Sequence, residues 1–388
     1  MEIYALSVLY LVPQYVGALS HALTLTLTLT LTMKYQLFGH SGLRVSEVCL
    51  GTMTFGEDWG WGSSEAEARK IYDRFREQGG NFIDTANMYT MGTSEKLLGE
   101  FMQGHRDEVV LATKYSNAQP GKDPNAGGNH RKSMMRSVGE SLKRLKTDYI
   151  DLYWLHIWDS MTPIDEVMRG FDDLVSQGKI LYAGVSDAPA WWISRANTIA
   201  ELRGWAPFIG LQIEYSLLER APERELLPMA HALGLDVVAW SPLAGGFLSG
   251  KYQVTAEGIR SESGSSRMDT PDMQQFLKDK PRLESVIDAV RSVAKSTGKS
   301  PAQIALAWLT NQPHPVIPII GARRLDQLDA NIQGAALQLS ADHLNQLNEA
   351  SRIDLGFPID FFNMPMVRQF VHAGMADSIK DLGKRISK

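Results

Sequence analysis

Residues 149–186 read YIDLYWLHIWDSMTPIDEVMRGFDDLVSQGKILYAGVS. The apolar runs Tyr149–His156 and Ile180–Ser186 are typical of buried strands. Between them, residues 163–177 place apolar side chains three and four positions apart, as one face of an amphipathic helix requires. A strand, a helix and a second strand in this order indicate a βαβ unit, in which the two strands are parallel.

The same alternation of short apolar runs and longer amphipathic segments continues along the chain from residue 34. We expect eight strands, at Val45–Thr52, Asn81–Ala86, Glu108–Tyr115, Tyr149–His156, Ile180–Ser186, Gly210–Tyr215, Asp236–Ser241 and Val316–Ile320. Helical patterns between them include Ser64–Gln78, His130–Lys146, Pro163–Gln177 and Leu283–Thr297. Eight alternations over about 300 residues predict an α/β fold of the closed (β/α)8 TIM-barrel type.

Two additions to the barrel are expected. Residues 34–45 hold Gly39 and Gly42 between apolar stretches, which predicts an N-terminal β-hairpin that covers the barrel floor. From Ala341 onward the sequence predicts a C-terminal extra helix and then a loop. Phe361-Phe362 in that loop are candidates to close a substrate pocket.

The composition limits the kinds of partner. Of the 388 residues 44% are hydrophobic and 21% are charged, which is typical of a globular protein. A formal net charge of -5 provides no bulk attraction to nucleic acid or to an anionic membrane, so the expected partner is a small molecule. Cys49 is the sole cysteine, so no intrachain disulfide forms, and we expect a cytoplasmic protein.

Residues 1–32 do not follow the barrel pattern. Residues 3–20 are uncharged and apolar, and residues 23–32 repeat Leu-Thr with a period of two. No Lys or Arg precedes the apolar run, which argues against a secretory signal, and Pro13 disfavours a spanning helix. We favour a low-complexity extension outside the fold, with Met33 as the working start of a barrel domain over residues 33–388. A disordered tail and a membrane or aggregation element are the alternatives.

Polar side chains close most of the expected strands. In a (β/α)8 barrel the loops that follow the carboxyl ends of the strands carry the chemistry, so polar residues there are candidates for function. Asp84 and Thr85 close the second strand, Lys114 the third, His156 the fourth and Ser186-Asp187 the fifth; Gln212 lies in the sixth, and Ser241 closes the seventh.

Six stretches at or near these strand ends resemble the aldo-keto reductase family, and the resemblance covers residues 34–352. They are Gly51–Gly56, Asn81–Tyr89, Ala112–Lys114, Asp151–His156, Gly184–Ser186 and Trp240–Leu243. Six matches in order are far more specific than any one of them. The resemblance implies a barrel that reduces aldehydes and ketones to alcohols with NADPH, by a reversible hydride transfer.

The resemblance also implies a catalytic group made of Tyr89, Lys114, Asp84 and His156, without a metal. In the family a tyrosine donates a proton to the carbonyl oxygen, and Tyr89 takes that position. A free phenol titrates at about 10, so we expect the Lys114 cation to lower the pKa of Tyr89 while Asp84 pairs with Lys114. His156 is expected to hydrogen-bond and polarise the carbonyl. Singly, these residues also fit a solvated lysine, a helix cap and a core histidine.

No strand is followed by G-x-G-x-x-G, so a Rossmann domain is not supported and the barrel itself must hold NADPH/NADP+. By resemblance, Ser186 and Gln212 bind the carboxamide, Tyr215 stacks on the nicotinamide ring, and Arg323 binds the adenosine 2′-phosphate. The full expected cofactor set is Thr52, Met53, Asp84, Ser186, Asp187, Gln212, Tyr215, Trp240, Ser241, Pro242, Leu243, Gly245, Lys251, Gly321, Arg323, Gln327 and Asn331.

Two positions in this set need comment. The family usually has Asn or His where this chain has Asp187, and an ionised carboxylate near the ring favours the cationic oxidised nicotinamide. Residues 245–251 match the G-x-x-x-x-G-K pattern of a P-loop, but Tyr252 stands where a magnesium-binding Ser or Thr is required, so nucleotide triphosphate hydrolysis is rejected.

Trp59 and Trp158 are the expected aromatic residues of the substrate pocket, which favours a flat, moderately apolar aldehyde or ketone. Two other functions stay open. One is a cofactor-binding regulatory subunit resembling the potassium-channel β subunits, which carry Asn at the position of His156. The other is an alcohol or sugar dehydrogenase working in the oxidative direction. The sequence is compatible with a monomer or a small homo-oligomer.

Overall fold

The computed structural model describes residues 33–255, 258–261, 280–314 and 316–379. The expectations for residues 1–32 lie outside the described residues. Among the described residues, no helix combines the length and the apolar character that crossing a bilayer requires.

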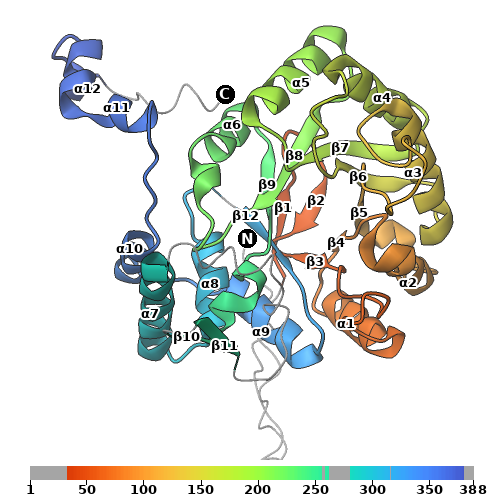
Figure 1. Ribbon diagram of the computed structural model, residues 1–388, viewed down its shortest axis with the longest axis horizontal. Helices are drawn as coiled ribbons and strands as arrows, with labels where there is room; N and C mark the ends of the chain where they lie inside the picture. Colours follow the sequence, from red (N-terminus) through yellow and green to blue (C-terminus); the bar gives the residue numbers. More distant parts are fainter. Residues whose placement is uncertain (1–32, 256–257, 262–279, 315, 380–388) are drawn as a thin grey trace, which may run out of the picture. The chain divides into compact units, whose positions relative to one another are not determined.

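Eight parallel strands close into one barrel, in the order β12-β3-β4-β5-β6-β7-β8-β9 (Figure 1). The strands are β3 (Cys49–Gly51), β4 (Phe82–Asp84), β5 (Val110–Tyr115), β6 (Ile150–Leu155), β7 (Ile180–Ser186), β8 (Phe208–Glu214), β9 (Asp236–Trp240) and β12 (Val316–Ile320). Each corresponds to one of the eight expected strands, so the predicted (β/α)8 barrel is confirmed.

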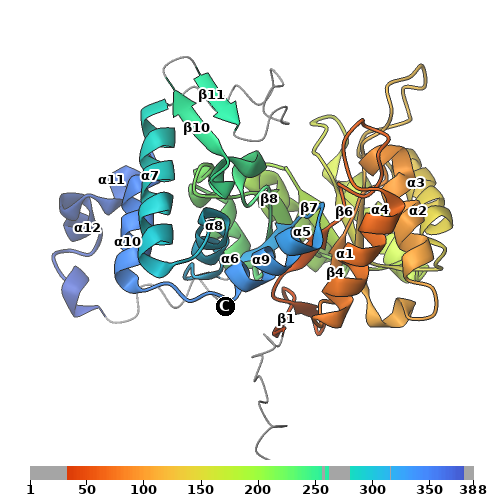
Figure 2. The same ribbon diagram turned by 90° about the horizontal axis from the view of Figure 1, so that it is seen from below.

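Helices surround the barrel, and α7 and α10 lie side by side at one flank (Figures 1 and 2). The helices are α1 (Glu65–Glu77), α2 (Thr93–Phe101), α3 (Arg131–Leu145), α4 (Ile164–Ser176), α5 (Ala190–Arg203), α6 (Leu226–Leu233), α7 (Lys280–Thr297), α8 (Pro301–Thr310), α9 (Leu325–Ala335) and α10 (Ala341–Ala350). Short 3-10 helices add η1 (Tyr89–Gly92), η2 (Arg106–Glu108), η3 (Ala221–Glu223), η4 (Ala244–Ser249) and η7 (Ala376–Ser378).

Local sequence explains where these helices begin. The Ser64 hydroxyl caps α1 by accepting a hydrogen bond from the Glu67 amide. At α8, Ser300 and Gln303 form a capping box, and Pro301 occupies the first turn, where its missing N–H is not needed. The apolar faces of the helices then pack against the outer surface of the barrel, which holds most of the buried hydrophobic residues.

The barrel interior is a separate, smaller apolar cluster near the floor. The N-terminal hairpin contributes to it, as predicted: β1 (Tyr35–Leu37) pairs antiparallel with β2 (Arg44–Ser46). Phe38, between the two strands, is fully buried and packs edge-on against Phe82 and Trp154, with ring centroids 5.5 and 6.4 Å away. Gly39 has φ +54°, and a Cβ there would lie 2.1 Å from the Ile209 carbonyl oxygen, so glycine is required.

The first expected strand, 45–52, proved to be two strands. Val45 belongs to hairpin strand β2, and the barrel strand begins only at Cys49. Ser46 turns the chain between them, because its amide donates to the Asn81 Oδ1 and its hydroxyl donates to the Val48 carbonyl. A second unexpected element is the antiparallel pair β10 (Tyr252–Thr255) and β11 (Gly258–Ser261), after β9.

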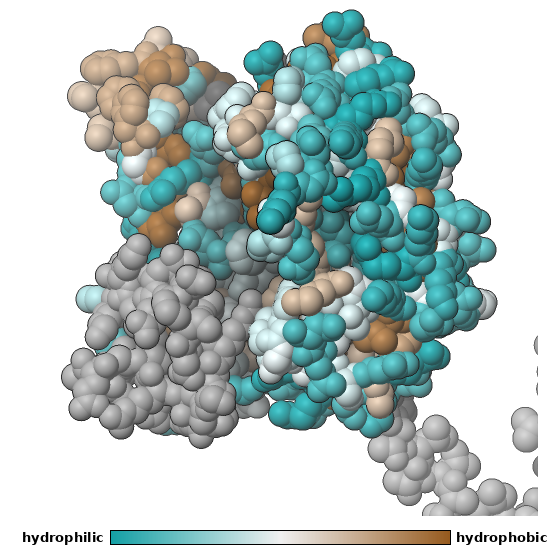
Figure 3. Space-filling view, turned by 45° about the vertical axis from the view of Figure 1, so that its right-hand side comes forward, coloured by the Kyte–Doolittle hydropathy of each residue, from teal (hydrophilic) through white to brown (hydrophobic). Residues whose placement is uncertain are grey.

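The C-terminal helix was predicted correctly, but the expected loop after it contains two further helices, α11 (Ile359–Asn363) and α12 (Pro365–Val371). These helices and their flanks expose many apolar side chains, and apolar residues gather there on an otherwise largely hydrophilic face (Figure 3). Phe361 and Phe362 are 45% and 61% exposed. The structure therefore does not place them in a closed pocket, contrary to the expectation.

Candidate active site

Strand alternation brings the polar candidates together inside the barrel mouth. Successive strand residues point to opposite faces, so the residues that share a face with the interior apolar cluster also point inward. Phe82 and Ala112 belong to that cluster, and Asp84 and Lys114 lie two residues further along the same strands. The same rule directs His156, Ser186, Gln212 and Trp240 inward at the carboxyl ends of β6, β7, β8 and β9.

Lys114 is the centre of the candidate catalytic group. Its ammonium group is fully buried and donates to Asp84 Oδ2 at 2.5 Å, to the Thr85 carbonyl at 2.8 Å and to the Tyr89 hydroxyl at 2.9 Å. Burial, the largest single effect, favours a neutral lysine, but the charges and hydrogen bonds of Asp84 and Tyr89 together outweigh it and raise the pKa of Lys114. Gln212 donates to the other Asp84 oxygen at 2.9 Å. The predicted Asp84–Lys114–Tyr89 arrangement is thus present.

The pKa of Tyr89 differs from the expectation. Burial raises it above the ordinary value of a phenol, and the Lys114 cation opposes that shift without reversing it. The predicted lowering by Lys114 is therefore only one of several effects on the pKa of Tyr89, and burial is the largest of them. Tyr89 is consequently a protonated phenol whose oxygen already accepts a hydrogen bond from a cation, so its own proton is free to be donated toward the mouth.

The segment that follows Tyr89 holds it in a constrained backbone conformation. Thr90 and Met91 have φ of 46° and 55°, a left-handed region that a β-branched residue such as Thr90 rarely adopts. The Thr90 hydroxyl donates to the Phe55 carbonyl at 2.7 Å and accepts from the Ser94 amide at 3.1 Å. These bonds stabilise the turn and so fix the position of the phenol.

His156 lies beside Tyr89, with ring centroids 6.0 Å apart in an edge-on arrangement. Burial and the nearby Lys114 cation hold the pKa of His156 well below its usual range, so the imidazole is neutral. The Asn117 amide nitrogen lies 3.2 Å from His156 Nδ1. If that nitrogen donates, Nδ1 is the acceptor and Nε2 carries the proton. Asn117 was not among the predicted residues, because its contact depends on the path of the loop after β5.

A second cluster of polar residues lies where β7, β8 and β9 end. The Ser186 hydroxyl is buried near the Asp187 carboxylate but makes no hydrogen bond of normal geometry, so its polar capacity is available to a ligand. Trp240 Nε1 donates to Asp187 Oδ1 at 3.1 Å. Burial raises the pKa of Asp187 to about 6, opposed by that hydrogen bond and by Lys114. Burial also raises the pKa of Glu214, to about 7.

Tyr215 does not reach this cluster. Its side chain is 2% exposed, its ring packs against Trp308 at 5.3 Å, and its hydroxyl donates to Glu223 Oε1 at 2.7 Å. Because Gln212 faces the interior, Tyr215 faces the surrounding helices, so the expected stacking on a nicotinamide ring is not supported. Trp240 is the aromatic residue that the structure places next to Asp187.

The loop after β9 has the shape of an anion cradle. Ser241, Gly245 and Gly246 have φ of 52°, 64° and 103°, and the Ser241 hydroxyl accepts a hydrogen bond from the Gly245 amide at 3.0 Å. Consecutive backbone amides in such turns form concave anion-binding nests. Lys251 is exposed beyond it, and strand β10 begins at Tyr252 where a P-loop would continue as a helix.

Residues 321–331, which were expected to bind the adenosine part of the cofactor, form the loop before α9 and the first turns of that helix. Gln327 accepts from the Arg323 amide at 3.0 Å, and buried Asn331 donates to the Gly321 carbonyl at 3.1 Å. Both side chains therefore hold the loop before α9, whereas Arg323 itself is exposed. Arg324 pairs with Asp326 at 2.7 Å, and both are largely exposed.

Of the other predicted residues, some border the candidate catalytic group and others stabilise the strands that carry it. Thr52 is buried and its hydroxyl donates to the Asp84 carbonyl at 3.0 Å, so it supports the catalytic strand. Met53 and Leu243 are half-buried, and Pro242 is buried. Trp59 lies edge-on to Tyr89 with centroids 6.5 Å apart, and Trp158 lies edge-on to Trp191 at 6.1 Å. Trp59 thus borders the candidate catalytic group directly.

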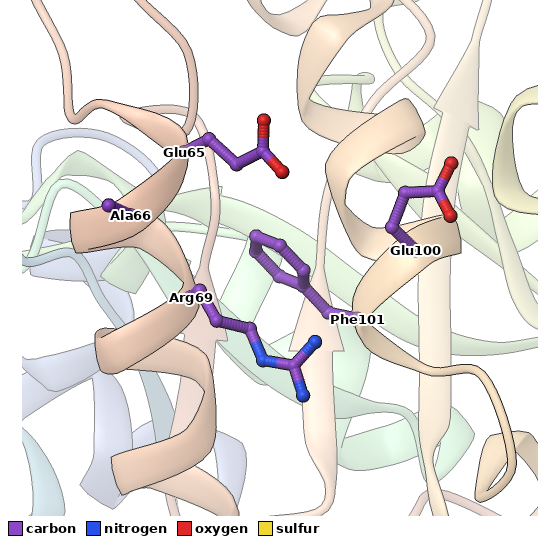
Figure 4. A pocket seen from close by; sticks show the side chains of 5 residues that line it. All are labelled: Glu65, Ala66, Arg69, Glu100 and Phe101. Atoms are coloured by element: carbon purple, nitrogen blue, oxygen red, sulfur yellow. The ribbon is translucent and has the colours of Figure 1, made fainter.

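A separate surface hollow lies between α1 and α2, away from these residues, lined by Glu65, Ala66, Arg69, Glu100 and Phe101 (Figure 4). The Arg69 guanidinium lies 5.3 Å from the Phe101 ring centre, so the hollow is partly filled by a cation–π contact. Among the described residues, no group of three or more His, Cys, Asp or Glu side chains is arranged to hold a metal ion.

A parallel barrel with a buried Lys–Asp pair and a tyrosine at its mouth defines an oxidoreductase-type site, and comparison with known proteins agrees. The profile of the aldo/keto reductase family matches residues 47–352. An aryl-alcohol dehydrogenase [NADP(+)] of Phanerodontia chrysosporium is 38% identical over 354 residues, 87% of this chain and 90% of that protein. Norsolorinic acid reductase stcV of Emericella nidulans is 39% identical, over 83% of this chain and 82% of that protein. The chain belongs to the aldo/keto reductase family.

Proposed function

We propose that this protein reduces aldehydes and ketones to alcohols with NADPH, in a reversible reaction with Tyr89 as the general acid. The observation that supports this most strongly is the buried contact of Lys114 with Asp84 and Tyr89 beside a neutral His156. The names of its relatives include an aryl-alcohol dehydrogenase [NADP(+)] and a norsolorinic acid reductase, and the first of these favours an aromatic carbonyl substrate.

The residues of the barrel mouth fit a nicotinamide cofactor. The buried Ser186 hydroxyl, which makes no hydrogen bond of normal geometry, offers one to a carboxamide, and Trp240 offers an aromatic face. The positive-φ loop at residues 241–246 offers backbone amides to a pyrophosphate, and exposed Arg323 offers a guanidinium to a 2′-phosphate. When bound, the cofactor supplies or accepts the hydride.

The residues of this chain handle the proton. The rings of His156 and Tyr89 lie side by side, so a carbonyl oxygen that accepts from His156 Nε2 and from the Tyr89 hydroxyl is polarised before it becomes an alkoxide. As negative charge grows on that oxygen, the Tyr89 proton moves to it. The Lys114 ammonium, already bonded to the phenol oxygen, stabilises the phenolate that remains. Asp84 keeps Lys114 charged through the cycle.

The test is the fall in NADPH absorbance with an activated aromatic aldehyde, with NADH in parallel. Tyr89→Phe should lose about 10²- to 10⁴-fold in kcat, the usual contribution of a positioned acid, while its NADPH affinity stays near that of the wild type. Turnover that survives in Tyr89→Phe would refute the role of Tyr89. Cofactor binding without any turnover in the wild type would favour a regulatory subunit instead.

We also propose that residues 33–388 form the catalytic domain of a cytoplasmic protein. The single cysteine, Cys49, is buried in the barrel and unpaired, as expected in a reducing compartment.

A further inference from the structure

Two acidic side chains, Asp187 and Glu214, lie at the ends of β7 and β8. The Asp84–Lys114 pair lies on β4 and β5, in another part of the barrel wall. Asp187 follows β7 directly, and its amide donates to the Gln212 carbonyl of β8 at 3.3 Å. Glu214 lies two residues after Gln212 on the same inward face, and its register partner on β9 is Trp240. Trp240 in turn donates to Asp187, so three neighbouring strand ends bring both carboxylates to one place.

The catalytic group does not use either carboxylate. The charged and titratable groups near Asp187 are Lys114 on β5, Tyr89 on η1 and Glu214 on β8, and Glu219 is the additional acid near Glu214. Lys114 is already paired with Asp84 at 2.5 Å. Since an ion pair has no net charge, Asp187 and Glu214 leave this side of the mouth with an unbalanced negative charge when they are ionised.

We propose that Asp187, assisted by Glu214, makes this barrel hold the oxidised, cationic nicotinamide more tightly than the reduced, neutral one. The proposal rests on the nicotinamide-binding function proposed above. Its physical basis is that the nicotinamide ring carries a positive charge only in its oxidised form, so a nearby carboxylate attracts one redox state and not the other. The buried Ser186 hydroxyl next to Asp187 marks the same place for the carboxamide.

Tighter binding of the oxidised state has a consequence for the direction of the reaction. It lowers the reduction potential of the bound couple, because binding stabilises the oxidised form, and bound NADPH becomes a stronger hydride donor than free NADPH. Each tenfold difference between the two dissociation constants corresponds to about 30 mV for a two-electron couple. The acidic pair therefore favours carbonyl reduction on the enzyme.

The effect must depend on pH, in a direction set by the two carboxyl groups. With pKa values of about 6 for Asp187 and about 7 for Glu214, both are mainly ionised at about pH 8 and mainly protonated at about pH 5.5. The preference for NADP+ should be present at the higher pH and fade at the lower one. Titration of the 2′-phosphate affects NADP+ and NADPH alike, so it cancels in the ratio of their dissociation constants.

The experiment measures the dissociation constants of NADP+ and NADPH by quenching of tryptophan fluorescence, without substrate. Asp187→Asn keeps an oxygen for the Trp240 hydrogen bond and removes the charge, and the ratio Kd(NADPH)/Kd(NADP+) at about pH 8 should fall by about tenfold. Glu214→Gln should lower the ratio less. Glu349→Gln, which removes an exposed carboxylate on α10, is the matched control and should leave the ratio unchanged.

The outcomes separate the two proposals. If both cofactors bind and the ratio is the same in wild type and Asp187→Asn, the proposed preference of Asp187 for the oxidised cofactor is wrong and the proposed function stands. If neither cofactor binds to the wild type, the proposed function is wrong, and the proposed preference for the oxidised cofactor is wrong with it. Should Asp187→Asn not fold, the wild-type ratio at the two pH values provides the same test: a ratio that does not fall on acidification overturns the proposal.

Discussion

Removing one partner of the buried Asp84–Lys114 pair tests the organisation of the site independently of its activity. The Lys114 side chain is 0% exposed, the Asp84 side chain is 2% exposed, and their charged atoms are 2.5 Å apart. At an effective dielectric constant of about 20, two unit charges about 2.5 Å apart attract each other by about 6.6 kcal/mol. The desolvation of both ions offsets much of this attraction. A variant that leaves the other ion buried alone is nevertheless expected to lose about 3–5 kcal/mol of unfolding free energy.

The assay is urea unfolding of four proteins: wild type, Asp84→Asn, Lys114→Met and the double variant. Each single variant leaves one buried ion without its partner, whereas the double variant leaves none. The double variant should therefore be more stable than the sum of the single effects predicts, by at least about 2 kcal/mol. Asp326→Asn, which breaks an exposed pair with Arg324, serves as the control and should leave the urea midpoint nearly unchanged.

Strict additivity of Asp84→Asn and Lys114→Met, with each costing under about 1 kcal/mol, would refute the reasoning. It would mean that the two side chains are solvated or separated in the folded protein. The proton-handling role of Lys114 would then lose its basis, because an exposed and mobile ammonium cannot hold the phenol oxygen of Tyr89 in one position.

Three further perturbations have expected outcomes. Gly39→Ala should lower the unfolding free energy by more than about 1–2 kcal/mol in urea titrations, because alanine is strained at φ +54° and its Cβ meets a carbonyl oxygen; an unchanged midpoint would contradict the hairpin geometry. Asn117→Leu should lower kcat by about tenfold with little change in KM, less than loss of the His156 donor itself, and Asn117→Asp should alter the pH profile of kcat. Folding raises the pKa of Asp187 from 3.8 to about 6, so the folded protein loses stability as the pH rises through that range and the carboxyl ionises. Asp187→Asn removes this loss and should raise the unfolding free energy, measured in urea, by about 1–3 kcal/mol at about pH 8. The gain should vanish toward about pH 4.

The barrel could be predicted because its information is local. Each strand is a short apolar run, and each helix between strands has a continuous apolar face, so the order of elements follows from sequence periodicity. The division of residues 45–52 into two strands could not be predicted this way. It depends on hydrogen bonds of Ser46 to Asn81 and Val48, and the first of these joins residues 35 positions apart.

Part of the candidate site could be predicted because side chains along a strand alternate between the two faces of the barrel wall. Asp84, Lys114 and Gln212 all lie on the inward face, and the same period of two also includes Glu214, which was missed. The same alternation keeps Tyr215 out of the barrel mouth, because Tyr215 lies three positions after the inward-facing Gln212 and its ring packs against Trp308 of α8. Assigning Tyr215 to the nicotinamide by resemblance alone overlooked that alternation. Asn117 follows no such rule, since its contact with His156 depends on a loop.

The balance of charge around the mouth also restricts the substrate. Lys114 contributes one positive charge, and Asp84, Asp187 and Glu214 contribute three negative ones when ionised, which gives a formal sum of -2. His156 adds none because it is neutral. The reduced nicotinamide that accompanies a carbonyl substrate is neutral and leaves this sum unchanged, so a substrate with its own carboxylate near the carbonyl meets repulsion. A neutral carbonyl compound meets none, and the aromatic edge of Trp59 beside Tyr89 offers it an apolar contact. We therefore expect neutral aromatic aldehydes and ketones to be better substrates than carboxylate-bearing ones of the same size.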